Sequence, residues 1–176
     1  MAVEKLRDGK RIVGTMVRMV RNPAIAQIAY HGGLDFIMFD LEHGPHSIET
    51  ISDVAKVARS MGLGIFARVP ELAKGYVSRL MDAGVEGIMV PMLSTAEEAD
   101  LLVKWSRFAP VGERGLGSSG EMNDFAGIKT DASTFMAEQN RKTLAIAQIE
   151  TAEAIKNIDA IASKEGIDVL LIGPND

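Results

Sequence analysis

The chain has 176 residues, a formal net charge of −5 and a hydrophobic content of 47%. This composition is typical of a globular domain with one sizeable core, and the absence of a basic cluster argues against nucleic acid or an anionic membrane as a partner. The lack of cysteine excludes disulfides, thiolate zinc sites and cysteine nucleophiles. With no membrane-spanning stretch and no signal-peptide-like start, we expect a single cytoplasmic domain over residues 1–176.

Short aliphatic runs recur along the chain, each followed by an amphipathic segment. Most of these runs are nearly continuous in apolar residues, which is typical of parallel strands covered on both faces. The predicted strands are Ile12–Met19, Phe36–Leu41, Gly64–Val69, Gly87–Leu93, Leu144–Ile149 and Val169–Ile172.

The segments between these runs carry helix signals. Helices are predicted to begin at Asn22-Pro23, at Ser47, at the capping-box pair Thr95 and Glu98, and at Thr151. The helix that begins at Ser47 should end at Gly62. The helix that begins at Thr151 should be continuous, with one apolar side formed by Ala154, Ile155, Ile158 and Ile161. Alternating strands and helices form right-handed βαβ units and a parallel sheet.

The even repetition favours an α/β fold of the (β/α)₈ TIM-barrel type over a doubly wound sheet. No G-x-G-x-x-G turn follows the first strand, so a dinucleotide fold lacks its main support. A complete barrel needs roughly 250 residues, and we therefore expect about six of its eight strands here. We also expect the natural polypeptide to continue for about 70 residues beyond Asp176, and a chain that ended there to be aggregation-prone and inactive.

Charged residues cluster where the predicted strands end. The ends carry Asp40, Glu42 and His43, then Arg68, then Gln148 and Glu150, and finally Asp176. In a barrel these carboxyl ends meet at one face, where barrel enzymes carry their chemistry. The amino-terminal ends of the strands are expected to carry no comparable set.

Each of these residues also has an ordinary structural explanation. Asp40 and Asp176 could cap helices, His43 could be a solvated loop side chain, Arg68 could form a structural ion pair, and Glu150 could favour a helix dipole. Their common position on one rim is what favours a functional site.

Strand alternation sharpens this prediction. Gln148 and Glu150 lie two residues apart and so point to the same side of their strand. Glu150 with Asp176 offers a two-carboxylate site that suits Mg²⁺ or Mn²⁺, and Arg68 offers a permanent cation for a carboxylate or enolate oxygen. No lysine lies at a strand end, which speaks against a Schiff-base aldolase and for metal-enolate chemistry.

Motifs along the whole chain carry a family resemblance. In order they are Asp40–Pro45, Ala67–Pro70, Met81–Gly84, Ile88–Met92, Gly112–Ser118, Gln148–Thr151 and Ile172–Asp176. Together they resemble the class II (metal-dependent) pyruvate aldolases, the group that includes 4-hydroxy-2-oxoheptane-1,7-dioate aldolase and 2-dehydro-3-deoxyglucarate aldolase. Phe108-Ala109-Pro110 stands where this family commonly has Tyr-Pro-Pro, and Asn175 replaces a common alanine.

The resemblance implies retro-aldol cleavage of a 4-hydroxy-2-oxo acid to pyruvate and an aldehyde, on a barrel of the phosphoenolpyruvate/pyruvate type. It implies that Glu150 and Asp176 hold a divalent metal, Mg²⁺, Mn²⁺ or Co²⁺. Arg68 matches the residue that stabilises the enolate oxygen of pyruvate. His43, oriented by Asp40, matches the dyad that moves the proton of the C4 hydroxyl.

The resemblance also assigns substrate contacts. Gln148 and Ser118 match substrate-binding positions, and backbone amides around Gly173, Pro174 and Asn175 would hold the pyruvate carboxylate. Asp82 matches a catalytic residue that reaches a neighbouring subunit's site, which implies a homo-oligomer, usually a hexamer.

Two alternatives to the aldolase stay open. An oxaloacetate decarboxylase or a relative of the citryl lyases would use the same metal-enolate chemistry with Glu150, Asp176 and Arg68. Only the aldolase needs a base for the hydroxyl, so His43 discriminates between these activities. The third possibility is an inactive fragment or oligomer scaffold.

Overall fold

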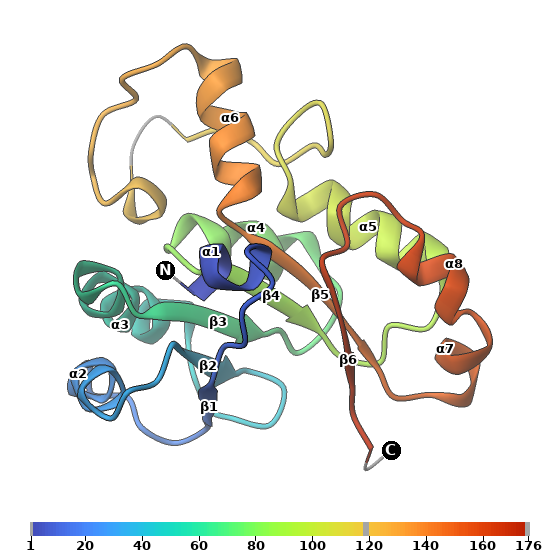
Figure 1. Ribbon diagram of the computed structural model, residues 1–176, viewed down its shortest axis with the longest axis horizontal. Coiled ribbons are helices and arrows are strands. Elements are labelled where there is room, and N and C mark those ends of the chain that lie inside the picture. The colour runs from blue at the N-terminus through green and yellow to red at the C-terminus, as the bar shows by residue number, and fades with distance from the viewer. Residues whose placement is uncertain (1, 118–119, 175–176) are drawn as a thin grey trace.

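The computed structural model describes residues 2–117 and 120–174. Parallel strands form one six-stranded sheet in sequence order, with each strand hydrogen-bonded to the next (Figure 1). The strands are β1 (Gly14–Val17), β2 (Phe36–Asp40), β3 (Gly64–Arg68), β4 (Gly87–Val90), β5 (Leu144–Ile149) and β6 (Val169–Ile172). All the predicted strands are thus confirmed as part of a parallel half-barrel, although β1 to β4 are shorter than predicted.

Helices connect the strands and cover the outer face of the sheet, except for the first, which precedes β1 and packs against the inner face. They are α1 (Ala2–Arg7), α2 (Ala24–His31), α3 (Ile48–Met61), α4 (Lys74–Asp82), α5 (Ala96–Ser106), α6 (Ala132–Arg141), α7 (Ala152–Lys156) and α8 (Ile158–Ala162), with a 3-10 turn η1 (Glu121–Asn123). In Figure 1 helix α6, which leads into β5, extends away from the sheet. Among the described residues, no helix has the length and apolar character needed to cross a membrane.

The helix signals in the sequence are largely confirmed. The Ser47 side chain accepts the Thr50 N–H, Gly62 ends α3 with a φ of 77°, and Thr95 and Glu98 form a capping box. The single helix predicted after Thr151 is wrong, because it divides into α7 and α8 at Asn157. The Asn157 side-chain amide donates to the Ser94 carbonyl at 2.9 Å. This bond holds the break between α7 and α8 against the loop that joins β4 to α5.

Two cores lie on the two faces of the strands. Side chains that point outward, such as Ile37, Ile65 and Ile88, pack against α2 to α5. Side chains that point inward, such as Met38, Phe66, Met89 and Ile146, form a second cluster with Ala2 and Val3 of α1. Because successive strand residues alternate between the faces, β2 to β6 contribute to both cores.

Glycines make room for two aromatic rings at the amino-terminal end of the inner face. Phe36 and Phe66 stack with ring centroids 4.7 Å apart. A Cβ on Gly14 would lie 2.6 Å from the Phe36 ring, and one on Gly87 would lie 2.7 Å from the Phe66 ring. Glycines and phenylalanines therefore lie side by side on neighbouring strands, and the two rings occupy the space that the glycines leave.

The expectation that the amino-terminal ends of the strands carry no comparable charged set is wrong. Asp35, Glu86 and Asp168 directly precede β2, β4 and β6. Asp35 accepts the Val13 N–H at 2.9 Å, and Asp168 accepts the Ala145 N–H at 2.8 Å. These carboxylates satisfy backbone donors where neighbouring strands begin, which is a structural role that composition alone does not reveal.

The packing of Gly87 against Phe66 leads to a stability prediction. Gly87→Ala should lower the free energy of unfolding by about 1–3 kcal/mol, because the new methyl group overpacks against a ring that is only 2% exposed. Gly75→Ala is the matched control: a methyl group at this position of α4 would have no other atom within 4 Å, and alanine favours helix by roughly 0.5–1 kcal/mol. Urea denaturation of both variants measures the difference, and equal stabilities would contradict this account of the inner face.

Candidate active site

The inner face of the sheet changes from apolar to polar at the carboxyl ends of the strands. On each strand, the residue two positions after an inward-facing residue also faces inward. This relation leads from Met38 to Asp40, from Phe66 to Arg68 and from Leu171 to Gly173. The register places Asp40 directly beside Arg68 on the neighbouring strand. Four of the side chains predicted to form a site, those of Asp40, Arg68, Gln148 and Glu150, therefore lie on one edge of one face. The inward positions at this edge are Arg18, Asp40, Arg68, Gln148, Glu150 and Gly173.

Asp40 and Arg68 form a buried, bidentate pair. Arg68 Nε donates to Asp40 Oδ1 at 3.0 Å, and Arg68 Nη2 donates to Oδ2 at 2.7 Å. Burial alone would raise the pKa of Asp40, but the hydrogen bonds from Arg68 and from the His43 N–H together lower it below its ordinary value. In the opposite sense, the bond to Asp40 outweighs burial and raises the pKa of Arg68. Both side chains are therefore charged at neutral pH.

Two further charged residues complete this cluster. Arg68 Nη1 lies 3.0 Å from Glu42 Oε2. Arg18 Nε lies 3.4 Å from Asp40 Oδ2, and Arg18 Nη2 donates to the His43 carbonyl at 3.1 Å. Sequence reasoning did not select Arg18, although it follows Met16 by two residues and so shares its side of the first strand.

His43 lies beside this cluster, but its ring does not meet Asp40 in the predicted way. Asp40 accepts the backbone N–H of His43 at 3.1 Å. The His43 side chain is 57% exposed, and its Nε2 lies 3.8 Å from Glu42 Oε2. Because Arg68 occupies both oxygens of Asp40, the carboxylate nearest to the imidazole in this structure is Glu42.

Glu150 is held at the same edge by β5 and by the turn after β4. Its Oε2 accepts the Met92 N–H at 2.9 Å, and its Oε1 accepts from the side-chain amide of Gln148. Met92 has a φ of 55°, a left-handed backbone conformation that is uncommon for a residue with a side chain. The carboxylate also contributes to the raised pKa of Arg68, after the larger effects of Asp40 and Glu42, so the two groups share one electrostatic environment.

Gly173 lies directly against this carboxylate. A Cβ at this position would lie 2.4 Å from Glu150 Oε1 and 2.9 Å from Gln148 Nε2. The Gly173 N–H, which is predicted to help hold the pyruvate carboxylate, donates to the Ile149 carbonyl at 3.1 Å within the sheet in this structure. Pro174 has no N–H to offer. The predicted contributions of Ser118, Asn175 and Asp176 lie outside the described residues.

Asp82 lies away from this edge, at the end of α4. Its side chain is 53% exposed and bonds Arg114 Nη2 at 2.7 Å. Because α4 carries the chain back toward the start of β4, Asp82 sits near the amino-terminal ends of the strands. Within one chain, Asp82 does not join the other predicted site residues.

Comparison with known proteins gives this site a family. Residues 17–176 match the family described as HpcH/HpaI aldolase/citrate lyase. The chain belongs to the HpcH/HpaI aldolase/citrate lyase family. The resemblance to metal-dependent pyruvate aldolases that the sequence motifs carry is thereby confirmed.

Relatives in this family include named aldolases. The chain is 37% identical to 4-hydroxy-2-oxovalerate aldolase of Novosphingobium aromaticivorans, over 97% of this chain and 63% of that protein. It is 31% identical to 5-keto-4-deoxy-D-glucarate aldolase of Escherichia coli, over 88% of this chain and 59% of that protein. The crystal structure of the HpcH/HpaI aldolase from Desulfitobacterium hafniense superposes with a TM-score of 0.92 at 35% identity, over 97% of this chain and 65% of that one. The chain therefore spans less than two thirds of the length of these relatives.

The contacts at this edge predict that Arg68 and Arg18 contribute unequally to the stability of the protein. Arg68→Met should cost about 3–5 kcal/mol of unfolding free energy at pH 7, because it leaves the buried Asp40 with only the long ion-pair contact to Arg18. Arg18→Met is the control and should cost at most about 1 kcal/mol, since Arg18 is 57% exposed and its contact is long.

The pH dependence checks the cause of this cost. Arg68 helps to lower the pKa of Asp40, so the stabilisation is present above pH ~4 and is lost as the pH falls through the lowered value. The difference between wild type and Arg68→Met should therefore shrink on acidification. Denaturation curves at pH 7 and at a pH well below 4 measure it, and a difference independent of pH would show that Asp40 is not the group involved.

Proposed function

We propose that this chain carries the catalytic edge of a class II pyruvate aldolase that cleaves a 4-hydroxy-2-oxo acid into pyruvate and an aldehyde, within a (β/α)₈ barrel. The observation that carries the proposal is the convergence of a fully charged Arg68 and the Glu150 carboxylate on the inner edge of one sheet. The named aldolases among the relatives support the same reaction class.

The residues around Glu150 suit a divalent cation that prefers oxygen ligands. Within residues 2–117 and 120–174, no group of three or more His, Cys, Asp or Glu side chains is placed to hold a metal. However, Gln148 is 5% exposed and its Oε1 is buried without a hydrogen-bond partner, directly beside the Glu150 carboxylate. Gly173 keeps a side chain from filling the adjacent space. Glu150 would hold Mg²⁺, Mn²⁺ or Co²⁺ together with Asp176, and the ion would supply positive charge to the keto oxygen of the substrate.

Arg68 supplies a second, fixed positive charge for the same purpose. A guanidinium has five N–H donors, and the described carboxylates of Asp40 and Glu42 engage Nε, Nη1 and Nη2 once each. One donor on each terminal nitrogen is left for a substrate oxygen. Asp40 fixes the orientation of the Arg68 guanidinium. The positive charge of Arg68 therefore needs no reorganisation when negative charge develops on the enolate oxygen.

His43 is the group proposed to move the proton of the C4 hydroxyl. The ring is exposed at the rim, and histidine is the side chain that most often serves as a general acid or base in catalysis. Since Arg68 occupies Asp40 in this structure, we assign Glu42 as the carboxylate that faces the imidazolium form. His43 is thus proposed as the general base, and Asp40 as the residue that positions both Arg68 and the His43 backbone.

A second activity is supported by the family description, which includes citrate lyase as well as aldolase. An oxaloacetate decarboxylase or a citryl-lyase-like enzyme would use Glu150 and Arg68 in the same way, but it would need no base for a hydroxyl group. The contribution of His43 therefore separates the two activities.

We also propose that the protein acts as a homo-oligomer, a hexamer by family resemblance. Asp82 supports this assembly, because it is half exposed yet held in place by the buried Arg114. An aspartate that is fixed and accessible far from its own rim is placed to reach a neighbouring copy.

Metal removal tests the reaction class. Excess EDTA should abolish pyruvate release from 4-hydroxy-2-oxo acids, and added Mg²⁺, Mn²⁺ or Co²⁺ should restore it. Glu150→Gln should abolish the metal-dependent activity, because it removes the charged ligand. Glu153→Gln, an exposed glutamate of α7, is the matched control and should stay active. Undiminished turnover in EDTA would contradict the class II assignment.

Substitution of the histidine tests the division of labour. His43→Ala should lower aldol cleavage by roughly 10²–10⁴-fold, the usual weight of general acid–base catalysis, and should affect oxaloacetate decarboxylation far less. His31→Ala, an exposed histidine at the end of α2, should change neither rate. Steady-state assays of both reactions decide it. Equal losses in the His43 variant would remove His43 from the role of hydroxyl base.

A further inference from the structure

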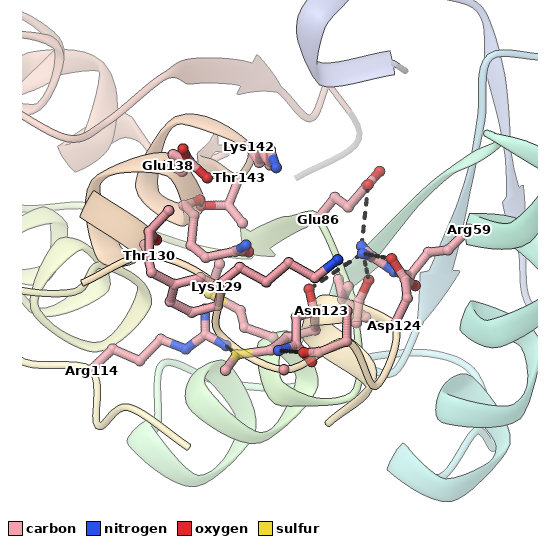
Figure 2. Close-up of a pocket in the computed structure, with 18 residues that line it drawn as sticks. Arg59, Glu86, Arg114, Asn123, Asp124, Lys129, Thr130, Glu138, Lys142 and Thr143 are labelled. Atoms are coloured by element: carbon pink, nitrogen blue, oxygen red, sulfur yellow. Dashed lines mark hydrogen bonds and ion pairs between the residues drawn. The ribbon is translucent and has the colours of Figure 1, made fainter. Parts of the chain in front are cut away.

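A cavity of about 350 Å³ lies at the amino-terminal ends of the strands, opposite the rim, which is the edge that carries the candidate active site. Its lining includes Glu86 and Thr143, which directly precede β4 and β5, and residues of the segment that contains η1 and α6 (Figure 2). We propose that this cavity binds a small anion with two or more negative charges, a phosphate ester or a polycarboxylate. The inference does not rest on the proposed function, because none of the rim residues lines the cavity.

Arg59 forms one wall of the cavity and is fully engaged. It donates to Asp124 at 2.7 and 2.8 Å and to Glu86 Oε1 at 3.3 Å, and it also reaches the carbonyls of Gly84 and Met122. Figure 2 shows these contacts converging on its guanidinium. Arg59 therefore neutralises the nearby acids and shapes the wall, and its role is structural.

Arg114 is different, because it is buried with few acceptors. Its side chain is 2% exposed, and its described acceptors are Asp82 Oδ1 at 2.7 Å and the Met122 sulfur at 3.4 Å. Its Nε has no hydrogen-bond partner, and burial lowers its pKa. Arg107 shows the contrast, since it is equally buried but bonds Asp168 and the carbonyls of Asn140, Thr143 and Gly166. A buried guanidinium with unfilled donors is unfavourable, and an anion in the adjacent cavity would offset that cost.

Two lysines add positive charge to the same space. Lys129 and Lys142 both line the cavity, and the ion pairs within the described part of the chain include neither of them. In Figure 2 the Lys129 side chain extends toward the region where Arg59 and Glu86 meet. Lysine is a common point-charge ligand for phosphate, and its flexible stem adapts to different anions.

The remaining acids do not cancel this charge. Asp124 is neutralised by Arg59, and burial raises the pKa of Glu86 to about 7, which reduces its negative charge near neutral pH. Glu138 is the other carboxylate of the lining, against the two lysines, and Asp82 pairs with Arg114 from outside the lining. The cavity therefore has an excess of positive charge, and its volume lies within the range of about 300–1,000 Å³ for small-molecule sites.

The test is titration calorimetry of the whole protein with inorganic phosphate, pyrophosphate and citrate as separate probes. At least one should bind saturably, with an affinity that weakens as salt is added. The arms distinguish the ligand classes: pyrophosphate alone would indicate a phosphate ester, and citrate alone a polycarboxylate. The double variant Lys129→Gln/Lys142→Gln should weaken binding at least tenfold, and the single variant Lys129→Gln should weaken it measurably if the double variant is unstable.

Three controls locate the binding. Lys10→Gln/Lys156→Gln makes the same change in charge at exposed positions outside the cavity and should retain wild-type affinity. Arg18→Gln should also retain it, because Arg18 lies at the carboxyl ends of the strands and does not line the cavity. Light scattering of the Lys129→Gln/Lys142→Gln variant should show an unchanged oligomeric mass.

Four outcomes would overturn the proposal. They are no saturable binding of any probe at low salt, equal losses in the two double-lysine variants, loss of binding in Arg18→Gln, and a change in oligomeric mass in the cavity variant. The last would show that the cavity faces a second copy of the chain and does not bind a small anion.

Discussion

The two-residue alternation of parallel strands is the constraint on which the rest of this structure depends. Strands that pair in register present matched rows of side chains, so a row that is apolar in the middle of the sheet continues in the same direction at its edge. The row that contains Met38 and Phe66 ends in Asp40 and Arg68, and the register pairs those two residues directly. A slip of one residue in either strand would send one member of the pair into the outer core, where neither charge has a partner.

The pairing of Asp40 with Arg68 determines what the neighbouring residues can do. A carboxylate with no exposed surface needs donors that keep it charged, and Arg68 with the N–H groups of Glu42 and His43 provides them. Because these donors must stay close to the buried Asp40, both Arg68 and the loop after β2 are held in place. The same arrangement leaves Asp40 without a free oxygen for the His43 ring, which explains why Glu42 faces the imidazole.

Local signals in the sequence predicted most of the fold and much of the rim. Helix caps at Ser47, Thr95 and Thr151 depend on neighbours within four residues, and all form as predicted. Strand runs and their alternation placed Asp40, Arg68, Gln148 and Glu150 on one edge. The break at Asn157 could not be predicted, because it depends on the carbonyl of Ser94, which is distant in sequence.

The sequence also could not predict which side chains pair with one another at the carboxyl ends of the strands. Alternation shows which face a residue occupies, but it does not show that Arg68 lies closer to Asp40 than His43 does. Nor does it distinguish an amide that is free for a ligand from one used in the sheet, as at Gly173. Arg18 is the exception, because the alternation that selected the other residues applied to it equally.

The two ends of the sheet use carboxylates in the same way but differ in the space that they leave. Asp35 and Asp168 at one end and Asp40 at the other all accept backbone N–H groups, so acids at both ends stabilise the chain. At the amino-terminal end, the inner face is filled by Phe36, Phe66 and α1, which excludes a substrate from it.

At the carboxyl end, Gly173 keeps a side chain out of the space beside Glu150, and the turn at Met92 holds the Glu150 carboxylate in place. Chemistry on the inner face is therefore confined to one end of the strands. The charged cavity at the other end lies on the outer side, since Glu86 precedes the inward-facing Gly87 and so points the opposite way. A ligand bound there would contact the beginnings of β4 and β5, the strands whose far ends position Met92, Gln148 and Glu150.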